Sequence, residues 1–412
     1  FWQDSTRTDV TSEFSGYHGY WPVSSTEVDR RLGSREALKH LTDSAHARGM
    51  NVLLDYVANH VHEDHPLMAA HPDWTTKLYL PDGSLNTERW DDHRLTTWFD
   101  TFIPTLDLER PEVSAAMTDS AAWWAYNSGI DGFRHDATKH IPENFWRELT
   151  AKLKAAHAET GTRLFQIGET YGSPDLIGSY LSSGMLDAQF DFNLYDKAVG
   201  AIAFEDGSWD DLVQTNEQSL ATYGAHHLMG NITGNQDRPR FTSLADGTLD
   251  VNEDMKFQGW TRDIQHGGDE GYAKMRLLMS YLMSVPGIPC VYYGDEIADV
   301  GGNDPDNRRM MRFGGLNNEE HLTRDWTATW ANLRRSRMSF LYGTTTFNQI
   351  NDDVLCIRRS YLSEITDVYL NRSNEPAPLP EGAMQPARML AGFLTEGAQL
   401  PAYGAVAFDL SN

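Results

Sequence analysis

The chain has 412 residues, of which 40% are hydrophobic, enough for one large domain with a sizeable core and a small second domain. Its formal net charge of −25 argues against nucleic acid and anionic membranes as partners, because phosphate binding needs a basic face. No apolar run approaches the length of a transmembrane helix. The chain opens at Phe1 without a signal-like segment, so we expect a processed or truncated start, and we favour a periplasmic or secreted location.

The first predicted elements are an aromatic loop and an amphipathic helix. Residues 16–21 read Gly-Tyr-His-Gly-Tyr-Trp, and glycines with aromatics in a loop entering a strand suit a platform for sugar stacking. The alternative is a tight aromatic turn. A helix is predicted over 34–48, with Ser34 as N-cap and Gly49 just after the end, because Leu38, Leu41 and Ala45 repeat at helical spacing.

A short predicted strand over 51–55 then leads into a polar segment that ends at His60. Residues 61–107 do not alternate between strand and helix and are rich in His, Pro, Asp and Trp. Long irregular segments inside a compact domain are usually functional. A helical pattern resumes around 113–121, and Gly129 precedes the next strand.

The stretch from Asp131 to His140 reads as the end of a buried strand that runs into a charged loop. Arg134 and Asp136 are two residues apart, so their side chains share a face of an extended segment. The guanidinium is expected to lower the pKa of the Asp136 carboxyl and keep it ionised, as covalent glycosyl transfer requires. A purely structural ion pair is the alternative.

Further strands and helices follow at intervals typical of alternating α/β structure. A helix is predicted from Pro142 to Gly161, and a strand over 163–168 carries Glu169. The remaining barrel-like elements are strands over 185–192 and up to Asp237, a helix over 269–284, a strand over 288–296 and a polar loop over 301–309. Beyond residue 342 short strand-like runs separated by Pro, Gly and Asn turns predict a β-domain.

Four polar segments at predicted strand ends carry a family resemblance. They span residues 53–60, 131–140, 164–169 and 230–237, in that order. Functional residues at the carboxyl ends of successive strands are typical of (β/α)8 barrel enzymes. In this order the segments resemble those of the α-amylase family of retaining α-glucoside hydrolases.

The resemblance implies an α/β fold, a (β/α)8 barrel with an irregular insertion after strand 3 and a small C-terminal antiparallel β-domain. The expected boundaries are 1–60 and 108–341 for the barrel, 61–107 for the insertion and 342–412 for a sandwich-like β-domain. In the family, residues 16–21 would end the second strand, and nothing in residues 1–15 can serve as the first. We therefore count seven barrel strands and expect that an N-terminal part is missing, because a barrel without one strand exposes two edges.

The resemblance also assigns roles to three carboxylates. Asp136 matches the nucleophile, Glu169 the acid/base, and Asp237 the residue that grips sugar hydroxyls and helps to distort the ring. Glu169 follows an apolar strand with no adjacent cation, so we expect partial burial to raise its pKa towards that of a general acid. The positions that match sugar-contacting residues are Tyr20, Trp21, His60, Arg134, Lys139, His140, Gln236 and Arg240. The family usually has His at position 236, and Gln cannot carry charge.

Calcium is the one metal that the resemblance implies. Asn59 and the backbone carbonyl of His140 match oxygen ligands of the ion, and acidic partners would come from residues 61–107. The alternative is that Asn59 simply ends the strand in a turn. No organic cofactor is expected.

The expected function is hydrolysis, with retention, of α-1,4-glucosidic bonds in starch, maltodextrins or cyclodextrins. A transglycosylase acting at the same site is the first alternative, because the ratio of glycosyl transfer to hydrolysis depends on how well the acceptor subsites exclude water. A non-catalytic carbohydrate-binding subunit is the second, and it conflicts with the presence of all three carboxylates. The expected partner is an oligo- or polysaccharide, and the oligomeric state is left open.

Overall fold

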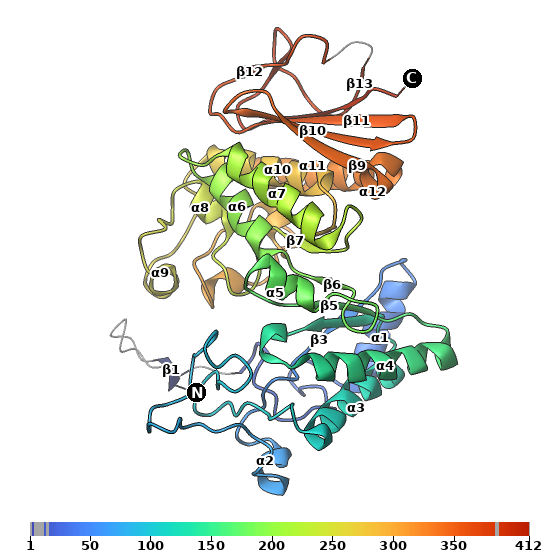
Figure 1. Ribbon diagram of the computed structural model, residues 1–412. Helices are drawn as coiled ribbons and strands as arrows, with labels where there is room; N and C mark the ends of the chain where they lie inside the picture. The colour runs from blue at the N-terminus through green and yellow to red at the C-terminus, as the bar shows by residue number, and fades with distance from the viewer. Residues whose placement is uncertain (1, 4–11, 14–15, 384–386, 412) are drawn as a thin grey trace. The chain divides into compact units, whose positions relative to one another are not determined.

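The computed structural model describes residues 2–3, 12–13, 16–383 and 387–411 (Figure 1). The chain divides into two compact units, Phe1–Phe190 and Asp191–Asn412, and each is described by itself. No helix of the described residues is both long and apolar enough to cross a membrane.

The first unit is built on a parallel sheet of four strands in the order β3-β4-β5-β6. These strands are β3 (Leu53–Tyr56), β4 (Gly132–His135), β5 (Phe165–Gly168) and β6 (Ala188–Gln189). Neighbours in this sheet are also consecutive strands along the chain, as repeated right-handed β-α-β connections produce. The carboxyl ends of all four strands therefore meet at one edge of the sheet.

Helices connect the strands of this unit, and local signals set their ends. They are α1 (Arg35–His46), α2 (Pro66–Ala70), α3 (Pro111–Ser128), α4 (Glu143–Thr160) and α5 (Pro174–Ser179). The Ser34 hydroxyl caps α1 by accepting a hydrogen bond of 3.3 Å from the Ala37 amide, as predicted. Gly129 and Gly161 end α3 and α4 with φ of 73° and 75°, in the left-handed region that favours glycine.

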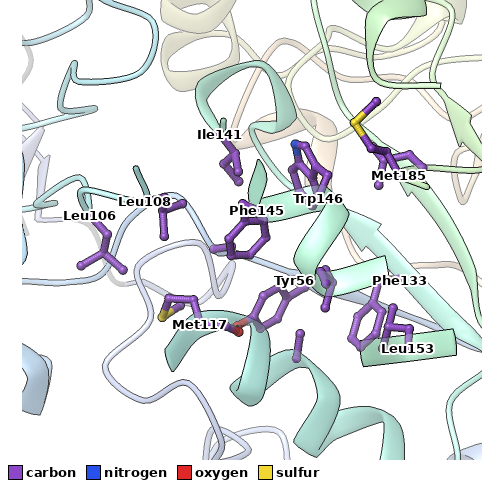
Figure 2. Close-up of a cluster of buried hydrophobic side chains, with 14 of the residues drawn as sticks. Tyr56, Leu106, Leu108, Met117, Phe133, Ile141, Phe145, Trp146, Leu153 and Met185 are labelled. Atoms are coloured by element: carbon purple, nitrogen blue, oxygen red, sulfur yellow. The ribbon is translucent and has the colours of Figure 1, made fainter. Parts of the chain in front are cut away.

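The core of the first unit lies between this sheet and helices α3 and α4 (Figure 2). Phe133 of β4 and Trp146 of α4 are completely buried in it. The Tyr56 hydroxyl donates a hydrogen bond of 2.6 Å to the Met117 carbonyl, so the phenol is satisfied although it is buried. This packing supports β3 and β4, and both strands lead into segments that carry residues of the predicted site.

Residues 61–107 are largely irregular, as predicted, with α2 and isolated β-bridges among them. The segment returns to the place where it leaves the sheet. Leu106 donates its amide to the Asn59 carbonyl at 2.9 Å, and Val61 donates to the Pro104 carbonyl at 3.2 Å. The excursion, as we call residues 61–107, is thus closed at its base beside β3.

The second unit begins with helices and a pair of parallel strands, β7 (Gly230–Ile232) and β8 (Ile288–Cys290). Its helices are α6 (Phe192–Ala203), α7 (Trp209–Tyr223), α8 (Phe241–Ala245), α9 (Met255–Thr261), α10 (Asp269–Ser284), α11 (Asn318–Ser336) and α12 (Met338–Tyr342). The α10 bounds equal the predicted 269–284. Two 3-10 turns, η2 (Asp295–Ile297) and η3 (Asp306–Arg308), follow β8.

The chain ends in an antiparallel sheet of five strands in the order β13-β15-β11-β10-β9. These are β9 (Thr344–Gln349), β10 (Val354–Tyr361), β11 (Glu364–Asn371), β13 (Arg388–Gly392) and β15 (Ala405–Asp409), and β12 (Ala377–Pro378) pairs separately with β14 (Gln399–Leu400). The predicted C-terminal β-domain is thus confirmed as an antiparallel sheet with its own apolar cluster.

Two strand predictions are wrong in detail. Residues 16–21 are a turn, and the nearest described strand before them, β2 (Ser12–Glu13), pairs antiparallel with β1 (Trp2–Gln3). The predicted strand over 185–192 is only two residues long, because Asp191 caps α6 by accepting a hydrogen bond from the Leu194 amide. Most of residues 1–15, where the first strand was sought, lie outside the described residues.

Candidate active site

The guanidinium of Arg134 is the centre of the site in the first unit. It lies 2.8 Å from carboxylate oxygens of both Asp55 and Asp136, and 2.6 Å from Glu169. The parallel register sets Asp55 of β3 opposite Arg134 of β4, and Arg134 opposite Ile167 of β5. Three consecutive strands therefore deliver three carboxylates to one cation at their carboxyl ends.

The predicted pair of Arg134 and Asp136 is present, but its electrostatic consequence differs from the prediction. Burial raises the pKa of the Asp136 carboxyl well above its usual range, Arg134 opposes the rise, and Glu169 and Asp55 add to it. The pKa of Arg134 itself is raised, since the three carboxylates outweigh the effect of burial. One cation is thus shared among three acids, which the spacing of residues 134 and 136 alone could not reveal.

The expectation that Glu169 has no cation beside it is wrong. Arg134 is 35 positions away in sequence, yet β4 and β5 are neighbours in the sheet, so its guanidinium reaches the Glu169 carboxylate. The same carboxylate accepts a hydrogen bond of 3.4 Å from the Ala137 amide, next to Asp136. Ala137 has φ of 49°, a left-handed conformation unusual for alanine that turns the chain out of β4.

Tyr20 and His60 lie on one side of this group. The Tyr20 hydroxyl donates a hydrogen bond of 2.7 Å to Asp55, and the Arg134 guanidinium lies 5.6 Å from the ring centroid of Tyr20. The His60 Nε2 atom is 2.9 Å from the Tyr20 carbonyl, and burial lowers the pKa of His60 to about 4. Trp21 packs edge-on against Phe102 of the excursion, with ring centroids 5.0 Å apart.

Lys139 and His140 lie in the 3-10 turn η1 (Thr138–His140), which follows β4. The Lys139 ammonium is 3.0 Å from Asp91, and burial lowers the pKa of His140 to about 4. The His140 ring contacts Trp90 and Phe99 of the excursion, with centroids 5.6 Å and 5.1 Å away. Aromatic residues of the excursion therefore pack against the two histidines of the predicted site.

The second unit holds the remaining predicted site residues. Gln236 donates its side-chain amide to Asp237 at 3.0 Å, and Arg308 of η3 lies 3.2 Å from the same carboxylate. Asn307 is completely buried and donates to the backbone carbonyls of Gln236 and Arg238 at 2.8 Å and 2.7 Å. The loop after β8 thus shapes the loop that presents Asp237.

Arg240 is placed in the interior of the second unit and is only 2% exposed. It pairs with Asp295 at 2.9 Å, donates to the carbonyls of Asn307 and Tyr293, and lies 4.2 Å from the ring centroid of Tyr292. These contacts engage the Nε and Nη1 atoms of the guanidinium. We therefore expect Arg240 to support the loops on either side of it, and its predicted contact with sugar stays a prediction.

The residues available for calcium fit the ion only in part. The Asn59 side-chain oxygen is buried and has no hydrogen-bond partner, as expected of an oxygen ligand. Calcium, however, takes six to eight oxygens that usually include carboxylates. Across the described ranges no group of three or more His, Cys, Asp or Glu residues could hold a metal ion. Calcium stays a prediction, and no step of the chemistry below depends on it.

Sequence reasoning missed several residues that the structure places beside predicted site residues of the same unit, the last of them in the second unit. These are Asp55, Trp90, Asp91, Arg94, Phe99 and Arg308. Asp55 and Arg308 lie in polar segments that the sequence did single out, 53–60 and 301–309, so their position at the end of a strand or in the loop beyond one was a usable signal. The excursion residues follow no periodic pattern, and their part in the site appears only when the chain is folded.

Comparison with known proteins identifies the family. A family model described as the alpha amylase catalytic domain matches residues 4–351. A cyclomaltodextrinase of Geobacillus thermopakistaniensis is 27% identical over 92% of this chain and 60% of its own length. Other curated relatives are covered over about half of their length, so this chain corresponds to only part of them.

Solved structures agree with this result. An alpha-amylase of Geobacillus thermoleovorans, complexed with acarbose, is 30% identical with a TM-score of 0.78, over 96% of this chain and 85% of its own. An alpha-amylase of Anoxybacillus is 28% identical with a TM-score of 0.79, over 96% of this chain and 83% of its own. The α/β architecture, the C-terminal antiparallel sheet and the match over most of the sequence lead to one conclusion: the chain belongs to the α-amylase family.

Proposed function

We propose that the protein is a retaining glycoside hydrolase that cleaves α-1,4-glucosidic bonds in starch, maltodextrins or cyclodextrins. Membership of the α-amylase family supports this function, as do relatives named cyclomaltodextrinase and maltogenic alpha-amylase. We also propose that the complete fold is a (β/α)8 barrel, with the excursion inserted after its third strand. The domain boundaries 1–60 with 108–341, 61–107 and 342–412 belong to the same proposal.

The observation that carries the proposal is the bridge that Arg134 makes between Asp136 and Glu169. One guanidinium contacts both carboxylates, at 2.8 Å and 2.6 Å. Retaining enzymes hold their two carboxyl groups about 5–5.5 Å apart, whereas inverting enzymes need about 6.5–9.5 Å to admit a water molecule. Carboxylates that share one guanidinium favour the shorter separation and hence retention.

The charge balance suits an acid and a nucleophile in the same group. Asp55, Asp136 and Glu169 surround the single cation Arg134, and burial favours protonation of Asp136. Burial raises the pKa of both Asp55 and Asp136, so we expect one of these carboxyl groups to retain a proton. When that proton lies on Glu169 and Asp136 is ionised, the pair is ready for reaction.

The proposed reaction then has two displacements. The Asp136 carboxylate attacks the anomeric carbon while Glu169 gives its proton to the departing glycosidic oxygen, leaving a glycosyl ester. Glu169, now ionised, takes a proton from water as the water oxygen displaces Asp136 and restores the free enzyme. The part of Asp237 in binding the sugar stays a prediction.

Substitution of the two carboxylates tests this assignment. Asp136→Asn should lower kcat by at least about 10³-fold, and Glu169→Gln by about 10²–10⁴-fold, the usual contribution of general acid catalysis. The measurement is hydrolysis of soluble starch and β-cyclodextrin, with the anomer of the first product followed by NMR. The matched control is Glu217→Gln, which changes an exposed carboxylate of α7 and should leave kcat unchanged.

Two results would contradict the proposal. Turnover retained in Asp136→Asn would exclude this residue as nucleophile, and a first product of inverted configuration would exclude the double displacement. Longer products from maltotriose would instead favour transglycosylation, the activity in the name of a Geobacillus stearothermophilus relative, a cyclomaltodextrin glucanotransferase that is 24% identical.

A further inference from the structure

One arginine of the excursion, Arg94, contacts the turn η1 with both its side chain and its main chain, and the sequence analysis assigned it no role. The guanidinium Nη1 atom of Arg94 donates to the Lys139 carbonyl at 2.7 Å and to the Tyr180 hydroxyl at 3.0 Å. The Tyr180 hydroxyl lies 3.2 Å from the same Lys139 carbonyl. The hydrogen bonds of this guanidinium, in the described part of the chain, thus go to neutral oxygens.

The main chain of Arg94 joins the same turn. Its carbonyl oxygen lies 2.7 Å from the Nδ1 atom of His140. Side chain and main chain of one excursion residue therefore hold two successive residues of η1. Nearby, the Lys139 ammonium reaches Asp91 of the excursion at 3.0 Å and the Tyr171 carbonyl at 3.2 Å.

A positive charge suits this place for a general reason. The last carbonyls of a helical turn have no partner within the turn and carry partial negative charge, so a cationic side chain stabilises them. The same part of the chain is where calcium was expected, at Asn59 and the His140 carbonyl. Among the described residues no group of three or more His, Cys, Asp or Glu could hold a metal ion, whereas Arg94 brings a permanent charge.

The turn η1 is also joined to the main chain of both proposed catalytic residues, Asp136 and Glu169. The Thr138 amide donates to the Glu169 carbonyl at 2.9 Å, and the Glu169 amide donates to the Thr138 hydroxyl at 3.0 Å. Asp136 precedes η1 by only one residue. Whatever fixes η1 therefore fixes the main chain that carries Asp136 and Glu169.

We propose that Arg94 is a positioning residue whose guanidinium takes the part of a metal ion, joining the excursion to η1 and so holding the catalytic carboxylates in place. The inference rests on the proposed hydrolase function only for its kinetic readout. It predicts that the attachment of the excursion to η1 depends on the positive charge of residue 94 and not on a divalent cation.

Three variants at position 94 test the charge. Arg94→Gln keeps a hydrogen-bond donor but removes the charge, Arg94→Lys keeps the charge, and Arg94→Ala removes both. A hydrogen bond with a charged donor is about twice as strong as a neutral one, so we expect kcat to fall about tenfold or more in Arg94→Gln and Arg94→Ala. In Arg94→Lys it should stay within a few-fold of wild type.

The matched control is Arg89→Ala. Arg89 belongs to the same excursion and also donates to a backbone carbonyl, that of Leu85 at 3.2 Å, but it does not touch η1. Kinetics are measured well below the melting temperature of every variant, so that loss of fold does not imitate loss of positioning. We expect the kcat of Arg89→Ala to equal that of wild type.

The second arm of the test uses calcium alone. Wild type is measured with a chelator and with excess calcium, and neither kcat nor the melting temperature should change. The proposal would be overturned if the kcat and the melting temperature of wild type fell in chelator and recovered with calcium. Equal kcat values in Arg94→Gln and Arg94→Lys would overturn it as well. Failure of the proposed function would be recognised separately, because wild type itself would then not cleave α-glucans. In that case the melting temperatures of the Arg94 variants, with and without calcium, would test whether the charge of Arg94 holds the excursion to η1.

Discussion

At the scale of single residues, the site of the first unit is organised by a cation rather than by a carboxylate. Arg134 contacts Asp55, Asp136 and Glu169 from three successive strands, and its guanidinium lies over the ring of Tyr20. Each contact restricts the guanidinium further. The orientation of the two proposed catalytic carboxylates therefore depends on residues that take no part in bond breaking.

Asp55 offers a test of this dependence. Asp55→Asn leaves a side chain of the same shape but removes the charge that holds Arg134 at 2.8 Å and the Tyr20 hydroxyl at 2.7 Å. We expect kcat/KM on maltodextrins to fall by about tenfold, the effect of losing a charged hydrogen bond. The control Tyr20→Phe removes only the hydroxyl and should cost less. An Asp55→Asn enzyme with unchanged kcat/KM would show that the orientation of Arg134 does not depend on the charge of Asp55.

At the scale of elements, the approach of β4 to β5 brings Arg134 and Asp136 to Glu169. Gly132 begins β4 with φ of 154°, and a Cβ atom placed there would lie 1.9 Å from the Phe165 carbonyl oxygen of β5. No side chain fits that space. The close approach of the two strands therefore depends on glycine at this position.

Gly132→Ala should consequently force the two strands apart. We expect a loss of about 3 kcal/mol or more in the free energy of unfolding, at the upper end of what overpacking costs, together with loss of activity. Urea unfolding measures the first effect. The control is Gly200→Ala in α6, where a Cβ atom meets nothing within 4 Å, and which should be neutral or stabilising by about 0.5–1 kcal/mol. Equal stability of the two variants would contradict this account.

At the scale of the whole molecule, stability in acid is a further consequence of how the first unit is packed. His135 of β4 is completely buried, with its Nε2 atom 3.1 Å from the Gln166 side-chain oxygen. Burial lowers the pKa of His135 to about 3. The native protein therefore holds this imidazole neutral, whereas the unfolded chain protonates it near its ordinary pKa of about 6.5.

The sign of the pH effect follows directly. Below pH of about 6.5 the unfolded state binds a proton that the native state refuses, so stability falls as the pH decreases towards the folded pKa of about 3. The contribution of His135 is about 1.4 kcal/mol per pH unit in this window. We expect the urea-unfolding free energy of His135→Gln to fall less steeply than that of wild type between pH 6.5 and 4 by about this amount. Parallel curves would show that His135 is protonated in the native protein.

The sequence by itself determined the order of the elements and the family. Helix ends at Ser34, Gly129 and Gly161 came from capping signals that act over three or four residues, and the α10 prediction came from a run rich in Leu and Met that stops before Pro286 and Gly287. The segments that carry Asp136 and Glu169 were recognisable because a strand followed by polar residues leaves a local trace. These signals depend on interactions between residues close together in the chain, so the predictions needed no coordinates.

Only the tertiary structure decided which charges meet. Arg134 meets Glu169, and Arg94 meets Lys139, although the members of each pair are far apart in sequence. The burial of Arg240 likewise depends on residues that are distant along the chain. Strand register and the return path of the excursion create these contacts, and neither leaves a periodic signal. Electrostatic energies depend on distance and burial, and both quantities exist only once the chain is folded.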